Sequence, residues 1–267
     1  MNFFSSLIAG AFGFWFIYLM QGLVTLYFSY DFDISAKFTV DGVQFGTSFT
    51  SPLWTKDAIV TVFLAPPIFF FFSGLLFLFL LGFIKRKSPV LMFFLLWMAI
   101  LSNSAAFGTM IEEGVAHSGL YRVTEALNLG LVLLVISVSV SIYFLYLTGV
   151  ITGKLILLNI DDSWKNNGGI KTEVFIILLL LPFLINLILF LIYANLNIAQ
   201  TIIFSMSFII LFPVLWVVPP KKNNFNTEPP GKFNFLDGIT VLLLSILVIL
   251  IYISINHGIE LPLTFFR

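Results

Sequence analysis

Three ionisable side chains beside an apolar segment are of types that bind metals or carry protons. They are Glu112, Glu113 and His117. Glu113 and His117 are four residues apart and would share one helix face, and carboxylate and imidazole are both zinc ligands. However, Gly114 weakens a helix at this point and the segment has the character of a loop outside the membrane. We therefore expect solvated or salt-bridged groups, with Arg122 as a partner, and keep a metal or proton site as the alternative.

A second group of polar side chains lies inside apolar segments, where an unpaired polar group is costly. Gln21 follows a stretch with several small residues, and Ser102, Asn103 and Ser104 precede another. Small residues let helices approach closely, and an amide can then bridge them. We predict that Gln21 and Asn103 hydrogen-bond within a tight interface between the first and third helices. A substrate path would use the same residue types, but it usually adds a charge, and none lies at mid-depth here.

The composition excludes several kinds of chemistry. The chain has no Cys, which rules out disulfides, Cys-ligated zinc, iron–sulfur clusters and thiol catalysis. The 13 basic and 13 acidic residues balance, and the basic ones are spread over short loops, so nucleic acid is not an expected partner. A haem between His117 and His257 is the one cofactor site that the His residues suggest. We expect no cofactor and no catalytic residue.

These side chains are positioned by apolar helices. Of the 267 residues, 60% are apolar and 10% are charged, more hydrocarbon than a soluble domain can bury. Blocks of about 20 or more apolar residues are long enough to cross a bilayer as helices. The blocks predict an all-α integral membrane protein, a polytopic bundle of about seven transmembrane helices, with the lipid bilayer as its main surroundings. They fall at 3–28, 58–84, 89–110, 127–150, 174–194, 198–218 and 237–256.

The connections between the blocks predict orientation and smaller elements. Nine Lys and Arg residues would lie on one side and four on the other, which predicts a cytoplasmic N-terminus and a periplasmic C-terminus. Usage of Phe, Ile, Asn and Lys points to a bacterial chain, hence to the bacterial inner membrane. Segment 29–57 alternates apolar and polar residues around Asp41-Gly42, which predicts an outside β-hairpin lying against helix ends or in the interface.

Prolines predict breaks and a division of the chain. Pro66-Pro67 predicts that the second helix starts at this pair. Pro182 predicts a kink whose released carbonyl Asn186 can bond. The Pro- and Lys-rich segment 219–236 predicts a cytoplasmic linker that sets the last helix apart. The expected units are a three-helix core with the hairpin over 1–125, three further helices over 126–218, the linker, and the last helix with an outside tail over 237–267.

The order of features over 1–125 resembles the core of site-2-type intramembrane zinc proteases, and also uncharacterised multipass membrane proteins of Bacteroidota. The residues that carry this resemblance are Met20 to Val24, Leu64 to Pro67, and Asn103 to Gly114. The family places His-Glu-x-x-His in its first helix, where this chain has Met20-Gln21-Gly22-Leu23-Val24, without ligand or base. The resemblance therefore implies a pseudoenzyme.

Three functions remain open from the sequence. The first is a non-catalytic subunit or scaffold that binds other membrane or envelope proteins. The second is a small transporter or channel, which a continuous water-lined cavity would favour. The third is a divergent intramembrane protease-like enzyme, which a bound metal would favour.

Overall fold

The fold is mostly helical, and six of its helices are long and apolar enough to cross a membrane. The structure is a computed structural model that describes residues 3–83, 88–116, 119–160, 164–166, 169–194, 198–217 and 235–260. The helical content confirms the expected helical class, and the six candidate spans have the length and composition of membrane-crossing helices. They are α1 (Phe3–Asp31), α2 (Lys56–Phe83), α3 (Pro89–Ala116), α5 (Leu131–Asn159), the continuous run of α6 (Thr172–Phe175), η2 (Ile176–Leu180) and α7 (Leu181–Tyr193), and α10 (Phe235–His257).

The predicted block 198–218 differs from the other six. It forms two short helices, α8 (Ile198–Ser205) and α9 (Ser207–Val214), which are interrupted at Met206. At 1.5 Å per residue, the 16 residues of these two helices rise only about 24 Å, less than the roughly 30 Å of a hydrocarbon core. The described part of the chain thus has six full-length candidates and a shorter apolar pair in place of seven equal helices.

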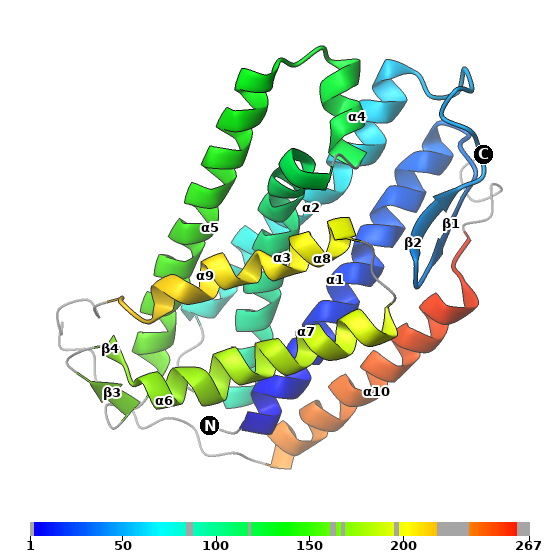
Figure 1. Ribbon diagram of the computed structural model, residues 1–267. Coiled ribbons are helices and arrows are strands. Elements are labelled where there is room, and N and C mark those ends of the chain that lie inside the picture. Colours follow the sequence, from blue (N-terminus) through cyan, green and yellow to red (C-terminus); the bar gives the residue numbers. More distant parts are fainter. Residues whose placement is uncertain are drawn as a thin grey trace.

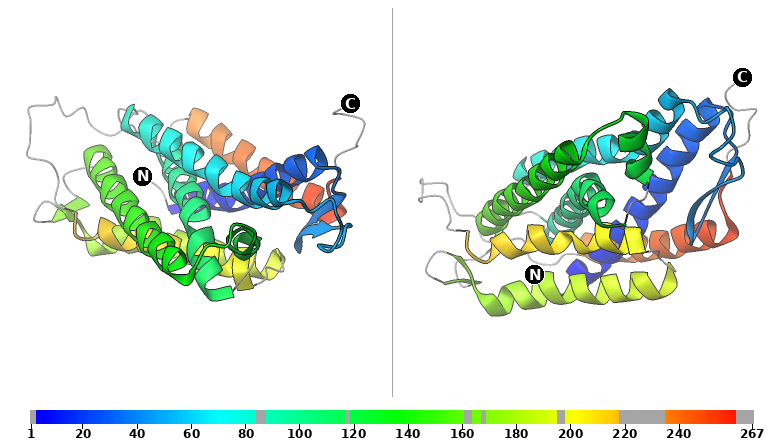
Figure 2. Two further views of the ribbon diagram at one scale, coloured as in Figure 1. Left: turned by 90° about the horizontal axis from the view of Figure 1, so that it is seen from above. Right: turned by 45° about the horizontal axis from the view of Figure 1, so that its top comes forward.

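The long helices run back and forth between two ends of the molecule (Figure 1). One end, called the hairpin end here, holds the last turn of α1, the β-hairpin, the short helix α4 (Gly119–Ala126) and the last turn of α10. The opposite end holds the first turns of α1, α3 and α10 (Figure 2). At that end the Ser88 hydroxyl donates a hydrogen bond to Asp237 Oδ1, which ties the start of α3 to the start of α10.

Helix α3 forms the centre of the bundle, and α5 and α10 lie at its edge. Trp97 on α3 is fully buried, whereas Leu131 on α5 is 76% exposed and Leu242 on α10 is 61% exposed. Exposed apolar faces of this size are the surface that lipid or another apolar helix covers. Helix α10 packs along α1, with the rings of Trp15 and Tyr252 5.2 Å apart. Helix α10 thus packs on the first helix of the chain, while most of 219–236, the predicted linker, lies outside the described residues.

The expected hairpin is present and packs against α1. Strand β1 (Ala36–Thr39) pairs antiparallel with β2 (Gly42–Phe45). Because Thr39 pairs with Gly42, the turn residues are Val40 and Asp41, not Asp41 and Gly42 as predicted. Gly42 follows the turn with a φ of +104°, as in turns that end in a glycine bulge. A second antiparallel pair, β3 (Lys165–Asn166) and β4 (Gly169–Ile170), lies at the opposite end.

Buried contacts hold the hairpin in place. The side chain of Phe38 is 1% exposed, and a Cβ atom built at Gly22 on α1 would lie 2.5 Å from its ring. The hydroxyl of Tyr18, near the middle of α1, donates a hydrogen bond to Val40 O at 2.8 Å. Phe38 also forms a β-bridge with Ile259, just after α10. The hairpin thus extends from the hairpin end down to the middle of α1.

Two expected helix boundaries are wrong. Helix α2 begins at Lys56 and continues through the buried pair Pro66 and Pro67, because packing on neighbouring helices can compensate for the missing backbone donors. Helix α3 continues through Gly114 to Ala116, so the cost of one glycine, about 1 kcal/mol, does not end the helix.

Candidate functional site

The polar residues predicted on α3 face different neighbours. Ser104 Oγ donates a hydrogen bond to Ile203 O on α8 at 2.7 Å. Asn103 Nδ2 donates to Ala99 O of its own helix at 2.8 Å, and its amide lies against Gly74 of α2. Ser102 Oγ is buried and has no hydrogen-bond partner in the described part of the chain. The three side chains therefore belong to separate contacts and do not form one site.

Gln21 and Asn103 were predicted to hydrogen-bond within a tight interface between the first and third helices, and neither does so among the described residues. Helices α1 and α3 do pack closely, but through Gly10 and Gly13, where added Cβ atoms would lie 3.4 Å from the Trp97 ring and 2.8 Å from Leu101. Gln21 is half-buried, and its Oε1 has no partner among the described residues. Asn103 instead points to α2, because it lies on a different face of α3 from Trp97 and Leu101.

A network missed from the sequence joins α1, α3 and the continuous helical run of η2 and α7. The Trp97 indole donates a hydrogen bond to Ser6 Oγ at 3.0 Å, and the Ser6 hydroxyl donates to Leu178 O at 2.5 Å. Pro182 has no N–H to offer to the carbonyl four residues earlier, which is that of Leu178. Ser6 therefore satisfies the released carbonyl. Asn186, the residue predicted for this role, donates to Leu7 O on α1 at 2.9 Å instead.

A second close approach joins α5 and α9. Gly149 and Gly153 are four residues apart on α5, and an added Cβ at Gly149 would lie 2.3 Å from Ile210 O. Such a position can be occupied only by glycine unless the helices move apart. The spacing is the Gly-x-x-x-Gly pattern of membrane helix pairs, a signal that the sequence contains and that our predictions did not use.

The acidic cluster is only partly within the described residues. Glu112 is 2% exposed near the end of α3, whereas His117 and the side chain of Glu113 lie outside the described part. Arg122 was expected as their partner, but its guanidinium carbon lies 3.6 Å from the centre of the Phe49 ring. His257 Nδ1 lies 2.8 Å from Ile253 O of its own helix. Among described residues no three His, Cys, Asp or Glu side chains are placed to hold a metal.

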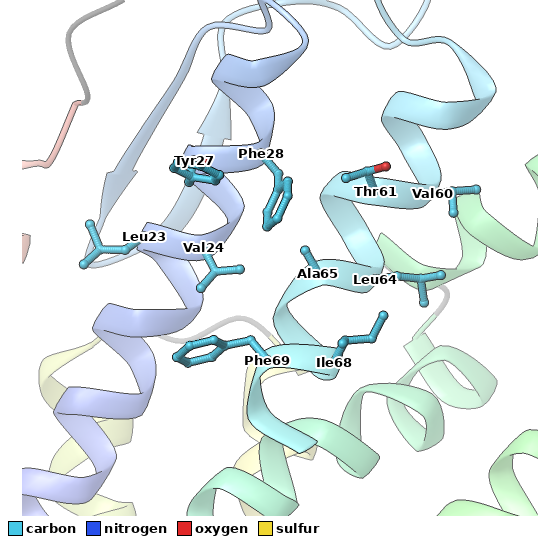
Figure 3. Close-up of a pocket in the computed structure, with 10 residues that line it drawn as sticks. All are labelled: Leu23, Val24, Tyr27, Phe28, Val60, Thr61, Leu64, Ala65, Ile68 and Phe69. Atoms are coloured by element: carbon cyan, nitrogen blue, oxygen red, sulfur yellow. The ribbon is translucent and has the colours of Figure 1, made fainter. Parts of the chain in front are cut away.

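An open apolar groove of about 740 Å³ lies between the last turns of α1 and the first half of α2 (Figure 3). Figure 3 shows Val24 and Phe28 of α1 and Ala65 and Phe69 of α2 pointing into the space between the helices. Its volume is in the range of small-molecule sites, about 300–1,000 Å³. The ten lining residues are Leu23, Val24, Tyr27, Phe28, Val60, Thr61, Leu64, Ala65, Ile68 and Phe69.

An aromatic cluster lies beside this groove at the hairpin end. The ring of Trp54 lies 5.0 Å from that of Phe45 in β2 and 4.6 Å from that of Phe49 in the following loop. It also stacks on Phe63 of α2 at 5.9 Å. These contacts, with Arg122 over Phe49, fix the loop between the hairpin and α2 against the start of α2.

Comparisons with protein-family models, curated proteins and solved structures found no match to this chain. The resemblance of residues 1–125 to site-2-type proteases therefore stays a hypothesis that depends on the order of its elements.

Proposed function

We propose that the protein is a non-catalytic multipass subunit of the bacterial inner membrane that holds other membrane or envelope proteins together. The proposed orientation has the N-terminus in the cytoplasm and the C-terminus in the periplasm, from the distribution of Lys and Arg. The observation that carries the proposal is that three buried polar side chains, Ser6, Ser104 and Asn186, donate to backbone carbonyls of neighbouring helices. Their hydrogen bonds hold the bundle together.

The edge helices supply the surface that such a subunit needs. Helices α5 and α10 expose rows of large apolar side chains. Partner helices bind such faces through packing. A photo-crosslinking residue at Leu242, which is 61% exposed, should give discrete products with specific membrane proteins. The matched control is Leu244 on the same helix, which is 8% exposed and should give none. Only diffuse lipid products at Leu242 would count against the proposal at this face.

A small transporter or channel is the second candidate, because two polar atoms favour it. Gln21 Oε1 and Ser102 Oγ are buried without hydrogen-bond partners among the described residues, and water in a path could solvate them. Deletion of the gene, followed by complementation with Gln21→Leu and Ser102→Ala, separates the two functions. The scaffold proposal predicts full complementation wherever the variants accumulate normally. Normal accumulation with loss of complementation would favour transport.

A further inference from the structure

We propose that the groove between α1 and α2 binds one zwitterionic phospholipid, such as a phosphatidylethanolamine, from the leaflet at the hairpin end. The groove is open along its side and its lining is apolar. Both helices are candidate membrane spans, so the surrounding medium is hydrocarbon. This site does not depend on the proposed scaffold function.

The length of the groove fits an acyl chain of one leaflet. On α2 the lining runs from Val60 to Phe69, and nine steps of 1.5 Å give about 14 Å. Half of a hydrocarbon core of roughly 30 Å is about 15 Å. A partner's transmembrane helix crosses the whole hydrocarbon core and needs a contact surface of that length. A helix, about 10–12 Å in diameter, would contact this groove over only a few turns. The small side chain of Ala65 leaves space between larger neighbours in which a flexible chain can lie (Figure 3).

The outer mouth of the groove carries charges that complement the headgroup. Lys56 lies one helical turn before Val60, and Asp31 lies one turn after Tyr27, so both continue the faces that line the groove. Both side chains are exposed, and neither forms an ion pair within the described part of the chain. A phosphate beside Lys56 and an ammonium beside Asp31 would each meet an opposite charge. Tyr27, one turn before Asp31, is of the aromatic type that is enriched at membrane interfaces.

The test is native mass spectrometry of purified, delipidated protein titrated with phosphatidylethanolamine. The variant Ala65→Trp fills the groove, and the matched control Leu76→Trp places the same side chain on α2 at a site that is 53% exposed and outside the groove. We expect wild type and control to hold one lipid per chain and Ala65→Trp to bind at least tenfold more weakly. Equal binding by both Trp variants would overturn the proposal.

The headgroup is tested separately with Lys56→Glu, which changes an exposed side chain and so keeps the fold. We expect weaker binding of phosphatidylethanolamine by this variant, with unchanged binding of diacylglycerol, which has no phosphate. An unchanged preference between the two lipids would overturn the proposal even if Ala65→Trp did not accumulate. The same spectra give the oligomeric state. If wild type has the mass of two 30.1 kDa chains and Ala65→Trp has the mass of one, a second copy of the chain occupies the groove. That result would also overturn the lipid proposal.

Discussion

Ser6 links three segments of the bundle through one hydroxyl group. It accepts a hydrogen bond from Trp97 and donates one to Leu178 O. Its replacement by Ala would leave a buried indole N–H and a carbonyl released by Pro182 without partners, and unsatisfied buried groups cost about 1–3 kcal/mol. Because hydrogen bonds in membrane proteins average about 0.6 kcal/mol and rarely exceed about 1.7, we expect Ser6→Ala to lower the free energy of unfolding by about 1–2 kcal/mol. Denaturation by SDS in mixed micelles measures it.

Ser139→Ala is the matched control for this substitution. Ser139 is exposed on α5 and donates only to Val135 O of its own helix at 2.8 Å. Its loss should change the free energy of unfolding by less than about 0.5 kcal/mol. If both variants unfold at the same SDS concentration, the Ser6 network does not stabilise the bundle.

Replacement of Gln21 should affect stability in the opposite direction to replacement of Ser6. Its Oε1 is buried without a hydrogen-bond partner among the described residues, and removing an unsatisfied polar group can be neutral or stabilising. We therefore expect Gln21→Leu to unfold at the same SDS concentration as wild type or at a higher one. A loss of more than about 1.7 kcal/mol, the upper range for a membrane hydrogen bond, would mean that the amide has a partner, water included.

The segment Met20-Gln21-Gly22-Leu23-Val24 predicts that the purified protein holds no stoichiometric zinc. A site-2-type enzyme needs its two His ligands and its Glu base at these positions, where this chain has Met20, Gln21 and Val24, which are neither usual zinc ligands nor bases. We expect less than about 0.1 zinc per chain in protein purified without chelators, measured by elemental analysis. One tightly held zinc per chain would contradict this and would direct attention to Glu112, Glu113 and His117.

At the scale of the elements, Gly149 allows the backbones of α5 and α9 to approach each other closely. A Cβ atom at Gly149 would lie 2.3 Å from Ile210 O, and this backbone atom cannot move without its helix. Overpacking costs about 1–3 kcal/mol, so we expect Gly149→Ala to lower the free energy of unfolding by at least about 1 kcal/mol. Gly130→Ala is the control, because no atom of the described residues lies within 4 Å of a Cβ there and its φ of −72° suits alanine. Equal thermal stability of the two variants in detergent would show that α5 and α9 separate easily.

The elements were predictable where local signals decide them. Apolar blocks predicted the six long helices, and alternation predicted the hairpin. The sequence did not reveal the break at Met206 or the unbroken course of α2 through Pro66 and Pro67. In both places, neighbouring helices determine which backbone groups are satisfied. Asn103 shows the same limit, because its helix was predictable but the neighbour that its side chain meets, Gly74, depends on how the helices rotate in the bundle.

At the scale of the whole molecule, contacts between residues far apart in the sequence fix the position of the last turn of α10. The bridge between Phe38 and Ile259 holds the end of α10 at the hairpin end, and an ion pair of 3.0 Å between Lys37 and Glu260 lies beside it. The first turn of α1 lies at the opposite end (Figure 1). If the bundle spans a membrane, the first turn of α1 and the last turn of α10 therefore face opposite sides. No sequence signal predicted the pairing of the hairpin with the end of α10.

The distribution of charge predicts which side is which. The predicted topology assigns four basic residues to the side of the hairpin and nine to the opposite side, including the run Lys85, Arg86 and Lys87 between the second and third apolar blocks. Cytoplasmic loops are the ones enriched in Lys and Arg, so the opposite end should face the cytoplasm. A green fluorescent protein fused after Lys87 should fluoresce, and alkaline phosphatase fused after Arg267 should be active. A second phosphatase fusion within α4, after Glu125, should also be active, because α4 lies at the hairpin end. Fluorescence at both 87 and 267, or an inactive phosphatase after Glu125, would contradict the proposed orientation.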